Sequence, residues 1–351
     1  MTSTTPEAQF EHERVLLNTG PRSGLTLAVA VHSTRLGQAL GGARVWQYPS
    51  WREALTDALR LSQAMTLKNA AAGLNRGGGK SVVQVPLGAT LTEAQQREAM
   101  LDLGDAIESL GGAYMTAEDV GTNAELMAVV RERTAHVCGL PPEQGGVGEP
   151  ADATAIGVHA SVKATLEAAF GSADPAGRHI VISGLGQVGG RLARALAADG
   201  AKLTVTDVNL QRQALAAELG AEWVDAAQAH RVQADLFAPC GLGGVLSPES
   251  IDELNVRAVA GAANNQLARH DGATQLKERG ILWAPDFVAN AGGVIFLDMA
   301  ESPDANEAVI QARVAQIGDT VGRVLRDAAE RDITTLQAAE ELAQARLDAA
   351  S

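Results

Sequence analysis

Three side chains in the first half of the chain have the types needed for joint chemistry. Lys68 and Lys80 stand twelve residues apart, the second directly after Gly77–Gly79, and Asp119 follows in an acidic stretch that begins at Ala117. Two lysines and a carboxylate of this kind can bind an anionic group, supply an amine of lowered pKa and move a proton. We expect the glycines to form a turn that holds Lys80 rigidly.

The glycines before Lys80 do not match a nucleoside-triphosphate loop. That motif needs a glycine six residues before the lysine, where this chain has Leu74, and a helix directly after it. Residues 81–85 instead have the composition of a strand. The sequence therefore argues against a P-loop nucleotidase.

A glycine motif in the second half has the spacing of a dinucleotide-binding turn. It consists of Gly184, Gly186, Gln187, Val188 and Gly189, between a predicted strand at 179–183 and a predicted helix at 191–198. In such a turn Gly184 reverses the chain, Gly186 lets the backbone approach a pyrophosphate, and Gly189 lets the helix pack closely. We therefore predict a nucleotide-binding βαβ unit.

Asp207 makes the nucleotide prediction more specific. It lies 18 residues after Gly189, at the end of a predicted strand at 203–206. A carboxylate there hydrogen-bonds a ribose diol and repels a 2′-phosphate, which favours NAD over NADP. Arg212, five residues further on, is better explained as a solvated helix cation than as a phosphate clamp.

Predicted strands and helices alternate along most of the chain, as a doubly wound α/β fold requires. In the first half we predict strands at 25–32, 44–48, 81–85 and 113–116, and helices that begin near Ser50, Thr92 and Thr122 with capping-box spacing. In the second half we predict a helix at 155–170, strands at 236–238, 258–261 and 281–284, and only helices at 308–350. Residues 140–153 hold three prolines and three glycines, which indicates a domain boundary.

The composition argues against several classes of protein. The 351-residue chain carries a net charge of −14 and only 3% aromatic residues, so we expect neither nucleic acid nor a membrane surface as partner. It has no apolar run of bilayer length and residues 1–9 lack the features of a signal peptide, so we expect a cytoplasmic protein. Cys138 and Cys240 are expected to be buried thiols, and no metal site is expected.

Taken in order, the motifs resemble those of the glutamate/leucine/phenylalanine/valine dehydrogenases, in particular the branch that acts on hydrophobic amino acids. The similarity extends from about Glu13 to Leu347. It rests on the segments Leu40-Gly-Gly-Ala-Arg44, Met65-Thr-Leu-Lys68-Asn-Ala-Ala-Ala-Gly73-Leu74, Gly77-Gly-Gly-Lys80, Thr116-Ala-Glu-Asp119-Val-Gly-Thr122, Gly184-Leu-Gly-Gln-Val-Gly189, Phe237-Ala-Pro-Cys240, Gly261-Ala-Ala-Asn-Asn265 and Ala284-Pro-Asp-Phe-Val-Ala-Asn-Ala-Gly-Gly293.

The resemblance implies an α/β fold with two domains. Residues 1–147 would form the substrate-binding, catalytic and oligomerisation domain, and residues 148–325 a Rossmann-type, doubly wound NAD-binding domain. Residues 326–351 would form helices that cross back to pack on the first domain. Because the family assembles through its first domain, the resemblance also implies a homo-oligomer.

The resemblance assigns a role to each candidate residue. Lys80 would be the catalytic lysine and Asp119 its acid/base partner, while Asn264 would contact the nicotinamide ribose. The substrate would be held at its amino group by Asn290 and at its α-carboxylate by Gly41, Gly42, Met65 and Lys68. The implied reaction is the reversible oxidation of an L-amino acid by NAD to the 2-oxo acid and ammonia.

The implied side-chain pocket is apolar, with walls formed by Leu40, Ala117, Val294 and Leu297. The two leucines replace a lysine and a hydroxyl residue of glutamate-specific relatives, so glutamate and aspartate should be poor substrates. Ala117 favours leucine, valine or isoleucine, because phenylalanine-type members tend to have glycine there. Residues 64–68 and 284–290 look closer to phenylalanine-type members, so phenylalanine is the alternative substrate.

The chain departs from the family pattern at two places: Ala43 stands where threonine is usual, and Phe296 where leucine-type members often have a polar residue. Two rival functions share the dinucleotide fold. One is a regulator that binds NAD without chemistry, against which the intact lysines and Asp119 argue. The other is a cyclodeaminase-type lyase that recycles its bound NAD.

Overall fold

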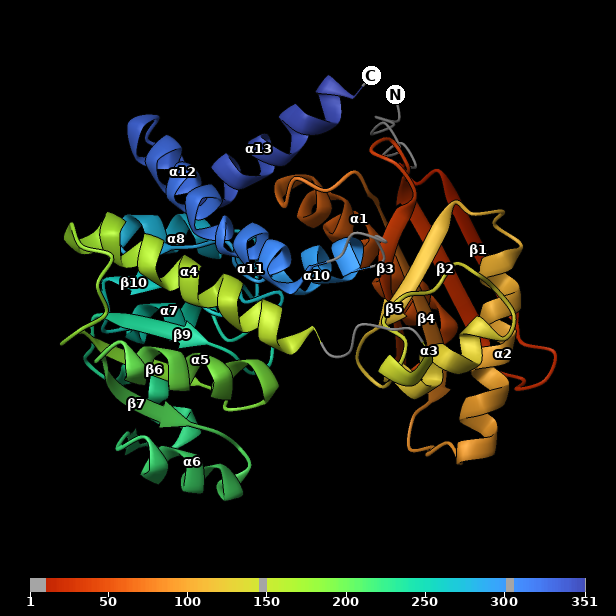
Figure 1. Cartoon of the computed structure of the whole chain (residues 1–351), viewed down its shortest axis with the longest axis horizontal. Coiled ribbons are helices and arrows are strands. Elements are labelled where there is room, and N and C mark those ends of the chain that lie inside the picture. The colour runs from red at the N-terminus through yellow and green to blue at the C-terminus, as the bar shows by residue number, and fades with distance from the viewer. Residues whose placement is uncertain (1–10, 145–149, 301–305, 351) are drawn as a thin grey trace, which may run out of the picture. The chain divides into compact units, whose positions relative to one another are not determined.

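The computed structural model describes residues 11–144, 150–300 and 306–350. The chain divides into two compact units, each built around its own sheet (Figure 1). The first unit comprises Met1–Ala70, Asn75–Gly148 and Ala350–Ser351, and the second comprises Ala71–Leu74 and Glu149–Ala349. The mixed α/β architecture with a Rossmann-type sheet, predicted from the sequence, is confirmed.

A five-stranded sheet forms the centre of the first unit. Its strands are β1 (Arg14–Thr19), β2 (Thr26–Ser33), β3 (Ala39–Tyr48), β4 (Gly77–Pro86) and β5 (Tyr114–Glu118), in the order β1-β2-β4-β3-β5. β3 is parallel to β4 and β5, whereas β2 is antiparallel to β1 and β4. β3 therefore lies between β4, which carries Lys80, and β5, which leads into the loop with Asp119.

Three helices cover this sheet: α1 (Trp51–Ala71), α2 (Glu93–Glu108) and α3 (Ala124–Arg131). Leu27 and Val29 of β2 pack against α2 and α3, while the alternate residues Ala28 and Ala30 pack against Ala58 of α1. Because neighbouring residues of a strand point to opposite faces, the two clusters lie on the two sides of the sheet.

Local hydrogen bonds fix where the helices begin. The predicted capping box of α2 is confirmed, because Thr92 and Gln95 each accept a bond from the other's backbone N–H. The predicted start of α3 at Thr122 is wrong by one residue, since Asn123 caps this helix through Leu126 N–H. The hydroxyl of Thr122 is instead used beside the candidate site.

The glycines before Lys80 lie in a strand, so the predicted turn is wrong. Gly77–Gly79 are the first residues of β4, and none of them has a positive φ. An added Cβ would lie 1.8 Å from the oxygen of Ser33 at Gly77, 2.1 Å from the nitrogen of Thr66 at Gly78, and 2.4 Å from the ring of Tyr114 at Gly79. The neighbouring β2, α1 and β5 thus approach too closely for any side chain, and Lys80 is held by the sheet itself.

Six parallel strands form the sheet of the second unit. They are β6 (His179–Ser183), β7 (Lys202–Thr206), β8 (Glu222–Trp223), β9 (Leu236–Pro239), β10 (Ala258–Val259) and β11 (Leu282–Trp283), in the order β11-β10-β9-β6-β7-β8. Strand order reverses direction between β6 and β9, where doubly wound sheets bind ligands at the carboxyl ends of their strands. The glycine turn follows β6 and therefore lies at this point.

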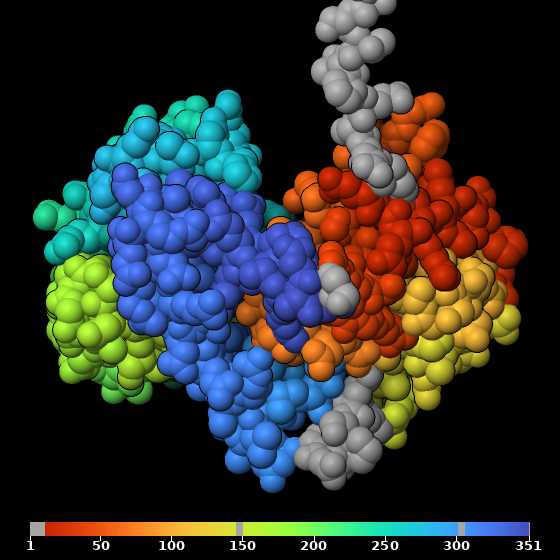
Figure 2. Space-filling view, turned by 90° about the horizontal axis from the view of Figure 1, so that it is seen from above, coloured from red at the N-terminus to blue at the C-terminus, as the bar shows by residue number. Residues whose placement is uncertain are grey.

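The helices of the second unit cover its sheet and continue to the end of the described chain. They are α4 (Ala151–Phe170), α5 (Gln187–Ala198), α6 (Gln213–Glu218), α7 (Pro248–Glu253), α8 (Gly272–Glu278), α9 (Asp286–Ala289), α10 (Gly292–Ala300), α11 (Glu307–Ala315), α12 (Ile317–Glu330) and α13 (Thr335–Ala349). α12 contacts both α4 and α13, and Figure 2 shows the blue C-terminal helices beside the yellow-green α4. The predicted packing of residues 326–351 on the first domain stays a prediction.

Candidate active site

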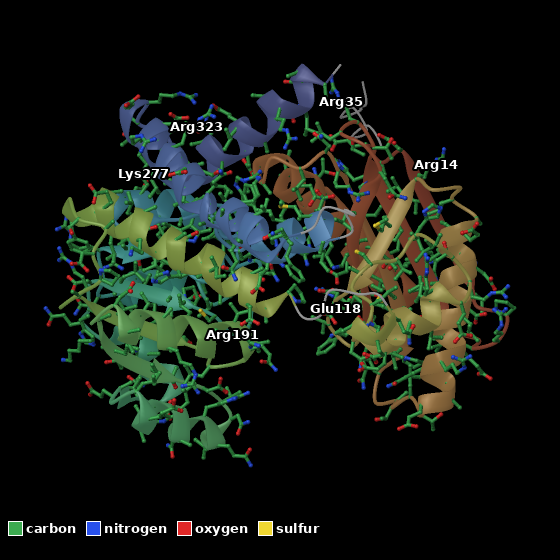
Figure 3. The ribbon with its side chains drawn as sticks, viewed as in Figure 1. Arg14, Arg35, Glu118, Arg191, Lys277 and Arg323 are labelled. Atoms are coloured by element: carbon green, nitrogen blue, oxygen red, sulfur yellow. The ribbon has the colours of Figure 1, made fainter. Side chains whose placement is uncertain are left out.

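Lys80 and Asp119 form a largely buried ion pair in the first unit. Lys80 Nζ lies 2.8 Å from Asp119 Oδ2, and the two side chains are 6% and 20% exposed. Asp119 directly follows Glu118, the last residue of β5, which Figure 3 labels. The pair crosses β3 at Gly42, where an added Cβ would lie 3.3 Å from Lys80 Nζ and 2.7 Å from Asp119 Cβ. The ion pair therefore depends on a glycine at position 42.

Burial and neighbouring charges shift both groups. Burial lowers the pKa of Lys80 below that of a free lysine, although Asp119 opposes the shift. Burial would raise the pKa of Asp119, but the charges of Lys80 and Arg44 outweigh it and lower that pKa to about 2. Asp119 is therefore a carboxylate at neutral pH, and Lys80 gives up its proton more easily than a solvated lysine. An amine of this kind beside a fixed carboxylate is suited to proton transfer.

Four further charged or polar side chains extend the pair into a network that the sequence analysis missed. Arg44 donates from Nε to Asp119 Oδ2 and from Nη1 to Asp57 Oδ2, both at 2.9 Å. Asp57 also accepts from the Tyr48 hydroxyl at 2.6 Å and from Arg60 at 2.7 Å. The presence of Arg44 in the Leu40–Arg44 motif was the one signal that could have indicated its part in this network.

The pairing of β3 with β4 is interrupted beside the ion pair, where Gly41 and Gly42 are buried. β3 pairs with β4 up to Leu40 and again from Ala43, whereas Gly41 and Gly42 pair with β5. A Cβ on Gly41 would lie 1.8 Å from the oxygen of Gly79 and 3.4 Å from Met65 Cγ. Gly41, Gly42 and Met65 are thus brought to the same part of the sheet as Lys80.

The other candidates of the first unit lie on α1, β3 and β5. Lys68 is half-buried and follows Met65 by three residues on α1, so both occupy one side of the helix. The amide of Asn69 anchors this helix by donating to the oxygen of Gly77 at 2.6 Å. Leu40 is buried in β3, and Ala117 of β5 is the register partner of Gly42.

The glycine turn of the second unit has two glycines that the fold requires and one that it does not. Gly184 has a φ of 105°, and an added Cβ would lie 2.6 Å from the nitrogen of Gly241. A Cβ on Gly189 would lie 2.0 Å from the oxygen of Gly184. At Gly186, the N-cap of α5, a Cβ would meet nothing within 4 Å. The exposed start of α5 therefore has the free N–H groups and the space that a pyrophosphate needs.

Asp207 stabilises this turn from the end of β7. Its Oδ2 accepts from the N–H of Leu185 at 2.6 Å and its Oδ1 from the N–H of Asn209 at 2.8 Å. Each carboxylate oxygen can accept a second hydrogen bond, so both retain capacity for ribose hydroxyls. Arg212 ends a short 3-10 helix (Leu210–Arg212) and is exposed, as expected for a solvated cation.

The remaining motif residues begin α5. Gln187 is exposed, and its Oε1 accepts from Arg191 at 2.7 Å, one turn further along the helix that carries the label Arg191 in Figure 3. Val188 is half-buried. The side chain of Gln187 is thus engaged by Arg191, which leaves the backbone N–H groups as the feature of this helix start that suits a phosphate.

Asn290 and Asn264 form an amide pair in the second unit. Asn290 donates from Nδ2 to Asn264 Oδ1 at 2.8 Å and to the oxygen of Ala262 at 3.1 Å. The Oδ1 of Asn290 is buried and has no hydrogen-bond partner among the described residues. An unsatisfied acceptor in a buried position is costly unless a ligand supplies a donor. Val294 and Leu297 follow on α10, half-buried and buried respectively.

The candidate residues fall into two sets, one in each unit. Those in the first unit are Leu40, Gly41, Gly42, Met65, Lys68, Lys80, Ala117 and Asp119, and those in the second are Gly184, Gly186, Gln187, Val188, Gly189, Asp207, Asn264, Asn290, Val294 and Leu297. Within residues 11–144, 150–300 and 306–350, no group of His, Cys, Asp and Glu could hold a metal ion. No helix in these ranges is long and apolar enough to span a membrane.

Neither cysteine forms a disulfide bond within the described part of the chain. Cys138 is buried and donates to the oxygen of Thr116 at 3.4 Å. Burial raises the pKa of Cys240 to about 12, so this side chain stays a thiol at neutral pH. The predicted burial is therefore confirmed for Cys138, whereas Cys240 is only half-buried.

Comparison with known proteins gives the family of the chain. Residues 12–136 match the model of the Glu/Leu/Phe/Val dehydrogenase dimerisation domain, and residues 204–351 match that of the Glutamate/Leucine/Phenylalanine/Valine dehydrogenases. Leucine dehydrogenase of Geobacillus stearothermophilus is 42% identical over 97% of this chain and 91% of that protein. The chain belongs to the Glu/Leu/Phe/Val dehydrogenase family. This confirms the resemblance inferred from the motifs.

Other relatives of this Glu/Leu/Phe/Val dehydrogenase act on different hydrophobic amino acids, as their names state. Valine dehydrogenase of Streptomyces albus is 39% identical over 97% of this chain and 93% of that protein, and phenylalanine dehydrogenase of Bacillus thermotolerans is 38% identical over 98% and 90%. The crystal structure of L-tryptophan dehydrogenase from Nostoc punctiforme is similar, with a TM-score of 0.82, 32% identity and 97% of each chain covered. The protein is therefore an oxidoreductase of the amino-acid dehydrogenase type.

Proposed function

We propose that the protein catalyses the reversible, NAD-dependent oxidative deamination of a hydrophobic L-amino acid to the 2-oxo acid, ammonia and NADH. The observation that carries the proposal is the buried pair of Lys80 and Asp119 across Gly42. It supplies an amine of lowered pKa and an ionised carboxylate at one place, which deamination requires for its proton transfers. The relatives named leucine, valine and phenylalanine dehydrogenase supply the class of reaction.

In the proposed reaction Lys80 and Asp119 move protons. The substrate ammonium first loses one proton to Asp119, and the loss of hydride from Cα then leaves an iminium. Neutral Lys80 accepts a proton from water as the water oxygen attacks that carbon. Asp119 returns its proton to the nitrogen, which leaves as ammonia, and the Asp119 carboxylate then takes the proton of the new hydroxyl group as the 2-oxo acid forms. The lowered pKa of Lys80 increases the fraction of neutral amine available for this step.

Substrate binding uses both charged ends of the amino acid. Lys68 offers a cation for the α-carboxylate, and Gly41 and Gly42 offer backbone groups where β3 and β4 are not paired. Met65 packs beside Gly41 and limits the space there. The Oδ1 of Asn290, which is buried and has no partner within the described ranges, is an acceptor suited to the substrate amino group.

NAD is the proposed coenzyme, and it would accept the hydride of the substrate Cα on its nicotinamide ring. The residues present fit this group. Gly186 leaves open space over the start of α5 for a pyrophosphate, and Asp207 presents a carboxylate at the end of β7 for the ribose. Asn264, paired with Asn290, would contact the nicotinamide ribose.

A side-chain pocket with the apolar residues that the family pattern implies would favour branched aliphatic substrates. Leu40 and Leu297 are both buried and apolar, so a substrate carboxylate beside them would lack a partner. Ala117, the register partner of Gly42, adds a methyl group to the wall near the backbone that would hold the α-carboxylate. Leucine, valine and isoleucine are therefore preferred. Phenylalanine is the second candidate substrate. The 38% identity of this chain to a phenylalanine dehydrogenase supports it.

The two units have separate roles in this proposal. Residues 1–147 bind the substrate, supply Lys80 and Asp119, and assemble the chain into a homo-oligomer. The match of residues 12–136 to a dimerisation-domain model supports the last role. Residues 148–325 would bind NAD, and Asn290, Val294 and Leu297 within this range would also contribute to substrate binding.

One absorbance experiment tests the proposal. The protein is mixed with NAD and each of a panel of L-amino acids, and both NADH and ammonia are measured. We expect NADH with leucine, valine and isoleucine, less with phenylalanine, and at least about a hundredfold lower kcat/KM with glutamate and aspartate. Ammonia without accumulation of NADH would indicate a cyclodeaminase, and NAD binding without either product would indicate a regulator. Either result overturns the proposal.

A further inference from the structure

Arg44 is held at both ends of its guanidinium. Its Nε donates to Asp119 and its Nη1 to Asp57, and the Arg44 side chain is 19% exposed. The Tyr48 hydroxyl and Arg60 both contact the same Asp57 carboxylate. Because a guanidinium is planar and its donors have fixed directions, fixing one end at Asp57 also fixes the direction of the other.

The Asp119 carboxylate is held by two cations, and its backbone is held by Thr122. Oδ2 receives both Lys80 Nζ at 2.8 Å and Arg44 Nε at 2.9 Å. The backbone N–H of Asp119 donates to the Thr122 hydroxyl at 2.8 Å, and that hydroxyl donates to the oxygen of Ala43 at 2.9 Å. Lys80 alone would neutralise the charge of Asp119, so Arg44 is a second positive charge on the same oxygen. This charge also acts on Lys80, whose pKa it lowers.

We propose that Arg44 is a positioning residue for the acid/base reaction, acting through Asp119, and that Asp57 sets how much of the Arg44 charge reaches the pair. The inference rests on the proposed function of Lys80 and Asp119. It adds a second layer, drawn from β3 and α1, to a site whose reacting groups come from β4 and the end of β5.

The charges in this network predict opposite effects for Arg44 and Asp57. The pair itself consists of Lys80 on β4 and Asp119 after β5. The charged and polar groups around it are Arg44 and Tyr48 on β3 and Asp57 and Arg60 on α1. Arg44 lowers the pKa of both Lys80 and Asp119, whereas Asp57 raises the pKa of Lys80. Loss of Arg44 should therefore raise both pKa values, and neutralisation of Asp57 should lower that of Lys80.

The test is the pH profile of kcat/KM for deamination, whose acidic limb reports the loss of the Lys80 proton. Arg44→Met should move this limb upward by about one pH unit or more, because it removes a positive charge that lowers the pKa of Lys80. Arg44→Lys should return the limb most of the way to the wild-type position, since it restores the charge. Asp57→Asn should move the limb downward.

Controls separate this inference from folding and from the proposed function. Arg97→Met removes an exposed arginine of α2 that pairs with Glu132 at the end of α3, and it should leave the limb in place. Opposite shifts in Arg44→Met and Asp57→Asn support the proposal, and thermal unfolding shows that both variants fold. If Arg44→Met does not fold, Asp57→Asn is the test: a downward shift of its limb supports the proposal, and an unmoved limb overturns it. An unmoved limb in a folded variant overturns the role of Arg44, while the proposed function fails separately if Lys80→Ala keeps its turnover.

Discussion

The two candidate sites of this chain, one in each unit, use different parts of the polypeptide to handle charge. The site of the first unit is a network of ionised side chains, in which Lys80, Asp119, Arg44 and Asp57 come from four separate elements. The site of the second unit is mostly backbone: a turn between β6 and α5 that leaves N–H groups open at Gly186. Side-chain charges can be tuned for proton transfer, whereas backbone dipoles suit a ligand that is only bound.

This difference predicts how each site fails. A substitution that removes charge from the first unit should change rate and pH dependence and leave NAD binding intact. A substitution that adds a Cβ to the turn should weaken NAD binding and leave the proton chemistry intact. A result that crosses these categories would show that the two sites do not act separately.

The largest effect is expected for Lys80→Ala. Loss of the amine should reduce kcat by about 10²–10⁴ or more, because acid–base and electrostatic contributions are removed together. The dissociation constant of NAD should be unchanged, as measured by fluorescence or calorimetry. Lys163→Ala, which removes a lysine 41% exposed on α4, is the matched control and should keep its turnover. A Lys80→Ala variant with more than about a tenth of wild-type turnover contradicts the catalytic role.

The same contrast explains what could be predicted from the sequence. The turn at Gly184–Gly189 was predicted with its strand, its helix and Asp207, because its geometry depends on consecutive residues. Arg44 was missed as the partner of Asp119 and Asp57 as the partner of Arg44, since β3 and α1 place these residues together only after folding. Gly77–Gly79 were wrongly predicted to form a turn. Glycine is required there by tertiary packing, because neighbouring elements leave no room for side chains.

Strands without a strong pattern were missed for a related reason. β1 (Arg14–Thr19) is mostly exposed and lies at a sheet edge, so it lacks the alternation of a half-buried strand. β8 is only two residues long. The strand at 179–183, by contrast, was predicted at its observed bounds, because its buried residues form a continuous β-branched run.

The second prediction compares two glycines of the same turn. Gly186→Ala should fold normally, because an added Cβ has no atom within 4 Å, but should weaken NAD binding about tenfold or more by occupying space that the pyrophosphate needs. Gly189→Ala should also lower thermal stability, since its Cβ would lie 2.0 Å from the oxygen of Gly184. Dye-monitored unfolding and NAD titration measure the two effects. Unchanged NAD affinity in Gly186→Ala would mean that the coenzyme does not approach this turn.

The third prediction concerns Asp207 and the choice of coenzyme. We expect kcat/KM to favour NAD over NADP by at least about tenfold, since a carboxylate beside a 2′-phosphate costs more than about 1.4 kcal/mol. Asp207→Asn keeps an oxygen for the N–H of Leu185 but removes the charge. It should therefore lower the ratio of kcat/KM for NAD over NADP and leave the hydrogen bond that stabilises the turn in place. Equal efficiency of the wild-type enzyme with both coenzymes would refute the role of Asp207. The exposed Arg212 would then be the residue to replace.

The smallest effect is expected at the apolar wall of the substrate pocket. Ala117→Gly should raise the ratio of kcat/KM for phenylalanine over leucine, because it removes a methyl group beside Gly42 and makes room for a ring. One methyl group in such a wall changes discrimination by roughly 10- to 200-fold, so the ratio should move within that range.

A glycine within a strand also costs about 0.5–1 kcal/mol of stability. Ala28→Gly, which empties a buried position of β2 packed against α1, is the control for that loss. The ratio should stay constant in Ala28→Gly. If it stays constant in Ala117→Gly as well, Ala117 does not line the pocket, and the branched-chain preference must come from Leu40, Val294 or Leu297.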